Sequence, residues 1–186
     1  MALRPERLVG YIARDLESDL ARWLPDAERV SVSPGVRPVA PFAARMPGGA
    51  AQVLLDFDAK VRSGALASLY RLNICDEWTY GFDFASHGVE VLDADRETDI
   101  AADVWSLATD GGGNHYVLLT NGQVALWIHD EGGLEEGGAG FDGLDALLWW
   151  KVRAAAVHRG VLTWSDVEPE LVALQEAGVI LDVECG

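Results

Sequence analysis

The pattern of apolar and polar residues between Thr109 and Glu131 (TDGGGNHYVLLTNGQVALWIHDE) predicts a central β-hairpin. Asn121-Gly122 separates two runs of β-branched, aromatic and aliphatic residues, and both residues tolerate the positive φ that a two-residue type I′ turn requires. With this turn, Leu119 faces Val124 across the hairpin. Both faces of the hairpin would then be apolar, so we expect it in the middle of a sheet with helices on at least one face.

The chain on either side of this hairpin shows the 3.6-residue period of amphipathic helices. Four stretches have this period and are bounded by proline, glycine or capping residues: 5–24, 50–72, 142–159 and 165–177. Gly64 would interrupt the second of these helices. Asp142, followed by Asp145 three residues later, is the expected N-cap of the third. Ser165 with Glu168 repeats this signature for the fourth.

A period of two, which is typical of strands, begins at Leu72. It predicts a strand over residues 72–84, which a turn at Ser86-His87-Gly88 would lead into a second strand at 89–92. Residues 104–108 predict a short strand that enters the central hairpin. Three remaining segments are rich in proline, glycine or acidic residues and are expected to be loops: 26–47, 93–103 and 131–140.

These elements together predict an α+β fold. We expect a mostly antiparallel sheet of about four to six strands, with N-terminal and C-terminal helices packed on it. The 186 residues suit one domain that can bury a sizeable core. Residues 1–186 are therefore expected to form a single domain, with 161–186 as a C-terminal helical extension.

The charge of the chain limits the partners that it can bind. It has 30 acidic and 14 basic side chains, which give a formal net charge of -16. Binding of nucleic acid needs clustered lysine and arginine, and this sequence has no such cluster. The acidic balance favours a basic partner, or it serves solubility alone.

The cysteine content and the hydropathy pattern bear on where the protein resides. Cys75 and Cys185 are too few and too far apart for a disulfide framework or a zinc site, so we expect reduced thiols. The N-terminal residues carry charges every few positions and lack the apolar core of a signal peptide. No run approaches the ~18 apolar residues of a membrane span. These features predict a cytoplasmic protein that does not associate with membranes.

Candidate chemistry gathers at the open end of the predicted hairpin. His115, His129 and Asp130, with Asp110 nearby, would suit a small metal-dependent hydrolase. On the predicted register, however, His115 lies on the face opposite His129, so we expect neither a metal nor another cofactor. The glycine-rich loop between Asp110 and Asn114 has no lysine and leads into a strand, which differs from a phosphate-binding loop.

The same residues resemble the core motif of the SUKH superfamily, also called SMI1/KNR4-like. The resemblance rests on the glycine-rich turn Asp110-Gly111-Gly112-Gly113-Asn114, an aromatic strand, a short turn, and a second strand that ends in Trp127-Ile128-His129-Asp130. Asn114 stands where the family usually has an aspartate. The resemblance implies a non-enzymatic protein-binding domain, since many bacterial members are immunity proteins that bind and neutralise toxins, often basic nucleases.

For this chain the resemblance and the charge together imply a basic toxin domain as the partner. The expected partner-binding residues are Asp110, Asn114, His129, Asp130, Glu131, Glu135 and Glu136. Two alternatives remain open. One is the metal-dependent hydrolase built on Asp110, His115, His129 and Asp130. The other is a structural module that forms a homodimer through the apolar helix face around Trp149 and Trp150.

Overall fold

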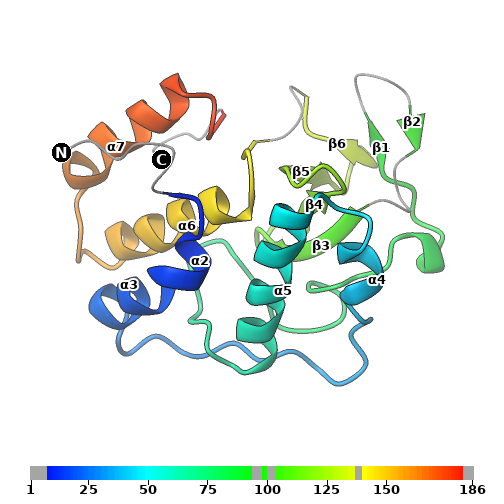
Figure 1. The fold of residues 1–186 in the computed structure, drawn as a ribbon, viewed down its shortest axis with the longest axis horizontal. Helices are drawn as coiled ribbons and strands as arrows, with labels where there is room; N and C mark the ends of the chain where they lie inside the picture. The colour runs from blue at the N-terminus through cyan, green and yellow to red at the C-terminus, as the bar shows by residue number, and fades with distance from the viewer. Residues whose placement is uncertain (1–7, 94–97, 100–103, 137–139, 182–186) are drawn as a thin grey trace.

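A computed structural model describes all of the chain except residues 1–7, 94–97, 100–103, 137–139 and 182–186. A twisted sheet lies beside a group of helices (Figure 1). The α+β class and the mostly antiparallel sheet predicted from the sequence are confirmed. The predicted start of the first helix, Cys185 and parts of the predicted loops 93–103 and 131–140 lie outside the described residues.

The sheet has the spatial order β2-β1-β6-β5-β4-β3. Its strands are β1 (Leu92–Asp93), β2 (Thr98–Asp99), β3 (Val104–Thr109), β4 (His115–Leu119), β5 (Val124–Ile128) and β6 (Gly133–Leu134). β1 pairs with β6 in parallel, and the other neighbouring strands pair antiparallel. The predicted hairpin β4–β5 therefore lies inside the sheet, as its apolar sequence requires.

The hairpin turn differs from the prediction by one residue. Leu118 pairs with Val124, and the N–H of Gly122 donates to the carbonyl of Leu119 at 2.9 Å. Gly122 has a φ of 96°, whereas Asn121 is not among the described residues with a positive φ. The connection is thus a three-residue loop that ends in a glycine bulge, and the predicted two-residue type I′ turn is wrong. Each side chain of β5 consequently faces a different partner from the one predicted.

Both faces of the hairpin are covered, as predicted. Leu118 and Val124 belong to the main core, which they share with apolar residues of the helices. Val117 and Trp127 point to the other face and pack in a smaller second core with residues from 82–91. That segment contains only one turn of 3-10 helix, η1 (Ala85–His87).

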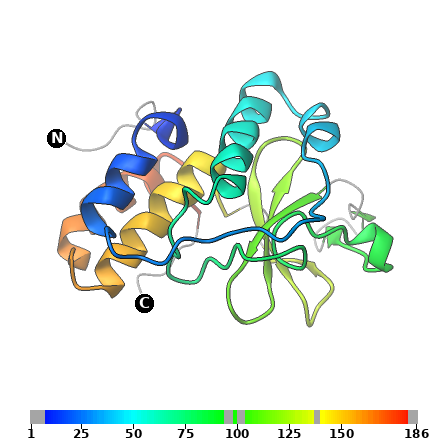
Figure 2. The same ribbon diagram turned by 90° about the horizontal axis from the view of Figure 1, so that it is seen from below.

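The helices lie on one side of the sheet, with α5 next to the hairpin (Figure 2). They are α2 (Tyr11–Arg14), α3 (Leu16–Trp23), α4 (Ala40–Ala43), α5 (Gly48–Arg62), α6 (Leu144–His158) and α7 (Trp164–Glu176). α2, α3 and α5 all contact α6. The centre of α6 is buried almost all round, and this includes Trp149 and Trp150. These two rings are therefore covered within the chain itself and are not available as a dimer surface.

Two of the predicted helices are shorter than their periodic patterns. Gly10 has a φ of 80°, and the helical stretch is interrupted again at Asp15, so the pattern predicted over 5–24 forms α2 and α3 separately. α5 ends at Arg62, just before Gly64, whose φ is 70°. The left-handed backbone at these glycines stops a helix that the apolar spacing alone would continue.

The predicted strand over 72–84 does not form. Asp76 instead accepts hydrogen bonds from the N–H groups of Trp78 (2.9 Å) and Thr79 (3.1 Å), which fold the chain into a tight turn. β1 pairs with β2 and β6 and not with this segment, so the second predicted hairpin is also wrong. The expected loop 131–140 also differs, because it contains the buried strand β6.

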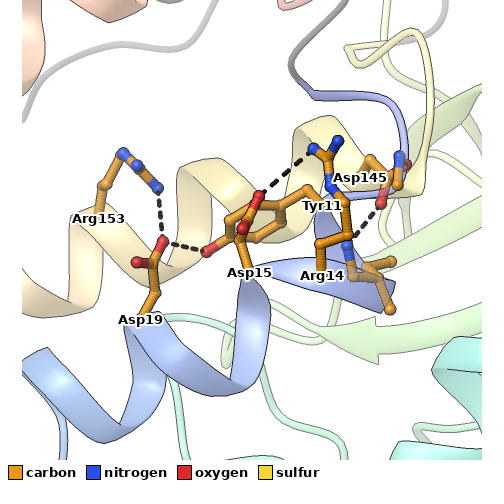
Figure 3. A network of polar contacts seen from close by, with 8 residues as sticks. Tyr11, Arg14, Asp15, Asp19, Asp145 and Arg153 are labelled. Atoms are coloured by element: carbon orange, nitrogen blue, oxygen red, sulfur yellow. Dashed lines mark hydrogen bonds and ion pairs between the residues drawn. The ribbon is translucent and has the colours of Figure 1, made fainter.

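The predicted helix caps are also revised. The N-cap of α6 is Gly143, without a side-chain hydrogen bond, whereas Asp145 accepts from the N–H groups of Gly10 (2.7 Å) and Ile12 (2.8 Å). α7 begins with a capping box formed by Thr163 and Asp166, not by the predicted pair. Asp145 thus satisfies the free N–H groups at the start of α2, which lies beside it (Figure 3).

Candidate functional site

The open end of the hairpin holds a chain of hydrogen bonds that starts at Asp110. This carboxylate accepts from the N–H of Gly112 at 2.7 Å and from the amide Nδ2 of Asn114 at 2.9 Å. The Asn114 Oδ1 in turn accepts from the N–H of His129 (3.2 Å) and lies 3.0 Å from its Nδ1. The glycine-rich loop after β3 is thereby tied to the residue that follows β5.

His129 extends this chain to Asp130. Its Nε2 lies 3.0 Å from the Asp130 carboxylate, which is 84% exposed. Gly113, with a φ of 97°, allows the close approach, because a Cβ there would lie 3.2 Å from Nδ1 of the His129 ring. The predicted residues Asp110, Asn114, His129 and Asp130 are therefore brought together on one hydrogen-bonded support.

The remaining predicted acids follow in the connection to β6. Glu131, Glu135 and Glu136 are all exposed. The N–H of Glu135 donates to the carbonyl of Leu126 at 2.8 Å, which continues the antiparallel pairing beyond β6. We refer to the predicted set as the acidic rim: Asp110, Asn114, His129, Asp130, Glu131, Glu135 and Glu136.

His115 begins β4 and is buried. Its Nδ1 lies 2.7 Å from the hydroxyl of Ser106, which donates to the carbonyl of Thr79 at 2.6 Å. Because the single O–H of Ser106 is used in the hydrogen bond to Thr79, the Ser106 oxygen accepts a hydrogen bond from Nδ1–H of His115. Ser106 therefore orients the imidazole and is not arranged as a nucleophile that the imidazole would activate.

The surroundings of His115 are aromatic. The rings of Phe82, Phe84 and Trp127 lie 5.1–5.6 Å from the imidazole centre. Burial lowers the pKa of His115 to about 4, and Asp110 offsets this only in part. The imidazole is consequently neutral near pH 7.

The observed register also changes the relation between the two histidines. His115 pairs with Trp127, so His129, two residues further along the chain, lies toward the same face. The prediction that the two histidines lie on opposite faces is wrong. Even so, the described part of the chain contains no group of three or more His, Cys, Asp or Glu side chains placed to hold a metal ion.

A buried pair that the sequence reasoning missed lies near the rim. Lys151 of α6 is 5% exposed, and its Nζ donates to the hydroxyl of Tyr116 at 2.6 Å. Burial lowers the pKa of Lys151 to about 8, and burial followed by Asp110 and Glu135 raises the pKa of Tyr116 to about 12. The signal in the sequence was a lone lysine within an otherwise apolar helix face.

A second polar network lies away from the rim, where α2 and α3 meet α6 (Figure 3). The hydroxyl of Tyr11 donates to Asp19 at 2.9 Å, and Arg153 lies 3.5 Å from the same carboxylate. These side chains line a cavity of about 370 Å³. Arg153 also reaches Glu170 of α7 at 3.6 Å, so the network joins four helices around one guanidinium and two carboxylates.

The rim can act through charge more readily than through bond-making chemistry. Its exposed carboxylates extend from a backbone that hydrogen bonds and strand pairing hold in place. A fixed cluster of like charges attracts cations and basic surfaces at long range. Ser106 and His115, the serine and histidine next to the rim, are not arranged as nucleophile and base, because the hydroxyl donates to Thr79 and accepts from the imidazole.

Comparisons of the chain with protein-family models, with curated proteins and with solved structures found no match. Within the described residues, no helix combines the length and apolar character needed to cross a membrane.

Proposed function

We propose that this protein binds a basic protein partner through the acidic rim and performs no reaction there. The observation that carries this proposal is the hydrogen-bonded support from Asp110 through Asn114 to His129, which places the exposed Asp130 carboxylate. A fixed carboxylate loses less side-chain entropy on binding than a mobile one. The formal charge of -16 adds long-range attraction for a basic surface.

The narrower proposal is that the partner is a toxin domain with a basic surface, such as a nuclease, and that this protein neutralises it. The SUKH resemblance of residues 110–130 supports it, as does the match of charge. A toxin domain that cleaves nucleic acid needs a basic surface, and an acidic cluster can occupy that surface in place of phosphates.

Charge reversal at the rim tests the general proposal. The double variant Asp130→Lys/Glu131→Lys is titrated with a deca-lysine peptide by calorimetry at low and moderate salt. We expect weaker binding than for the unchanged protein and a smaller salt dependence, because the steering charges are gone. The control Asp26→Lys/Glu28→Lys changes two exposed acids of the loop after α3 by the same net charge.

If the two double variants bind the peptide equally, net charge alone attracts the peptide and the rim is not a site. The toxin proposal needs its own assay. Co-expression with a basic toxin domain encoded next to this gene should restore growth, and the rim variant should not restore it. Metal analysis of the purified protein addresses the hydrolase alternative, since a stoichiometric ion together with turnover would contradict the proposal.

A further inference from the structure

An exposed tryptophan stands near the acidic rim. Trp78 is 56% exposed, whereas the other described tryptophans are buried or partly buried. Its ring stacks on Phe82, with centroids 5.3 Å apart and an interplanar angle of 29°, and lies 5.0 Å from the ring of His87. A large exposed apolar ring gains free energy when a partner covers it, and such rings are frequent in binding surfaces.

The loop that carries Trp78 is held firmly. The N–H of Trp78 donates to the side chain of Asp76. The hydroxyl of Thr79 accepts from the N–H groups of Cys75 and Asp76, both at 3.1 Å. The carbonyl of Thr79 in turn accepts from Ser106 on β3. The exposed ring is therefore presented by an ordered turn anchored on the sheet, so little conformational entropy would be lost on binding.

Cations pair with three of the other six tryptophans. Arginine side chains lie over the rings of Trp23, Trp105 and Trp149 at 4.2–5.6 Å from the ring centres. Among the described residues, no arginine or lysine lies over Trp78. The neighbouring Glu77 is exposed and forms no ion pair within the described chain. The nearby Asp83 is already 4.0 Å from Arg37.

The Trp78 ring is connected to the start of β4, beside the acidic rim, through ring contacts. Phe82, on which it stacks, lies 5.6 Å from the ring of His115, which directly follows Asn114 of the rim at the start of β4. Phe82 and His115 are themselves buried, so they fix where Trp78 lies relative to the rim without forming part of the surface that a partner would cover. The two surfaces together offer carboxylates at one end and an aromatic face beside Glu77 at the other.

We propose that Trp78 receives an arginine side chain of the basic partner, with the guanidinium on the indole ring and Glu77 beside it. This inference rests on the proposed function, because it assigns part of the same partner-binding surface. Arginine suits the position better than lysine, since its planar guanidinium stacks on aromatic faces and is less strongly hydrated.

The test compares deca-arginine with deca-lysine, two peptides of equal charge, on the full chain. The measured quantity is the ratio of their dissociation constants for the unchanged protein and for Trp78→Leu, which keeps an apolar side chain but removes the ring. We expect the preference for arginine to fall by about two- to fivefold in Trp78→Leu. Trp78→Tyr should retain part of it, and the control Val161→Ala, an exposed apolar residue after α6, should retain all of it.

This experiment and the rim experiment have different readouts, so the failure of one proposal can be distinguished from the failure of the other. Trp78→Leu should lower the arginine preference and leave the salt dependence unchanged, whereas the rim reversal should lower the salt dependence. An arginine preference that is the same in Trp78→Leu as in the unchanged protein would overturn the inference and leave the rim proposal intact. Absence of binding by either peptide would overturn both. The indole N–H resonance of Trp78 should also shift on addition of deca-arginine.

Discussion

Lys151 and Tyr116 join the buried helix α6 to the central hairpin. The Nζ of Lys151 donates to the Tyr116 hydroxyl at 2.6 Å and lies 4.4 Å from the centre of the same ring. An ammonium group surrounded by apolar side chains is costly, and one neutral hydroxyl compensates for only part of the lost hydration. This pair therefore makes the stability of the fold depend on pH.

The first prediction concerns this dependence. The pKa of Lys151 is about 8 in the folded protein and near 10.5 when unfolded, so the unfolded chain binds more protons between these values. The free energy of unfolding should consequently rise as the pH increases from 8 toward 10, by on the order of 2 kcal/mol. Lys151→Met should remove this rise, and urea unfolding at several pH values would measure it.

The unfolding free energies should be compared only below pH 10. Above it, tyrosines ionise in the unfolded chain while the raised pKa values of Tyr116 and Tyr80 keep these side chains neutral in the folded protein, which adds a second pH dependence. Lys60→Met provides a control, since this lysine pairs with Glu17 at the surface. A rise of equal size in Lys151→Met and in the unchanged protein would show that the amine of Lys151 keeps its charge in the folded state.

The second prediction concerns acid stability. His115 has a pKa of about 4 when folded and about 6.5 when unfolded, so the unfolded chain takes up a proton first as the pH falls. The stability that the neutral ring contributes is complete above pH 6.5 and is lost as the pH falls toward 4. After allowance for solvent screening, the loss should be on the order of 2 kcal/mol.

His115→Phe should lessen this loss, because phenylalanine fits among the neighbouring rings and does not titrate. Ser106 would keep Thr79 as its hydrogen-bond partner in the variant. The informative quantity is the difference in unfolding free energy between His115→Phe and the unchanged protein at each pH, since the many carboxylates titrate in both. His87→Phe is the control, because that ring is exposed. The prediction would be refuted if the unfolding free energy fell equally with pH in the unchanged protein and in His115→Phe.

The fold class followed from the sequence because periodicity reports burial. The two apolar faces of β4 and β5 correctly predicted an interior hairpin. The helix-period patterns located α6 and α7 to within a few residues, and they located the start of α5, which ends early before Gly64. Register depends on finer detail. Asn121-Gly122 suits a type I′ turn and also a three-residue loop with a glycine bulge, and only the backbone angles distinguish them.

The segment 72–84 shows the opposite case, in which alternation of burial does not mean a strand. Tyr80 and Phe82 are buried, as the two-residue period predicts, whereas Trp78, which the same period places on their face, is exposed. Asp76 nevertheless bonds to the local N–H groups, and a turn replaces the ladder. Periodicity records which side chains are buried, but it does not record where the backbone hydrogen bonds go.

The candidate site was predictable where its residues are close in the sequence or joined by the hairpin. Asp110 and Asn114 belong to one loop, and β4–β5 pairing brings His129 to them. Lys151 and Trp78 come from segments that reach the hairpin only through tertiary packing. No local pattern places them there, so their roles needed the structure.

The third prediction concerns Asp145, whose carboxylate accepts from the N–H groups of Gly10 and Ile12. Asp145→Ala should destabilise the protein by about 1–2 kcal/mol, because free N–H groups at a helix start lose their acceptor. Asp142→Ala, at an exposed position, should have an effect of less than about 0.5 kcal/mol. Chemical unfolding of both variants measures the difference, and equal effects would remove the capping role from Asp145.

The last prediction concerns the glycine that supports the rim. Gly113 has a φ of 97°, and a Cβ at this position would lie 3.2 Å from Nδ1 of His129. Gly113→Ala therefore combines backbone strain with displacement of the imidazole from Asn114. Gly132→Ala is a matched control, because Gly132 has a φ of 66° with no atom within 4 Å of its Cβ position. Both variants should lose about 1 kcal/mol of stability to the backbone.

Only Gly113→Ala should also weaken the binding of deca-lysine, because it moves His129 and with it the partner carboxylate of Asp130. The comparison separates the fixed placement of that carboxylate from its mere presence, since neither substitution changes the charge of the chain. If both variants bind the peptide as tightly as the unchanged protein, placement contributes nothing and the rim acts as a diffuse charge. If only Gly113→Ala binds more weakly, the hydrogen-bonded support is itself part of the binding surface.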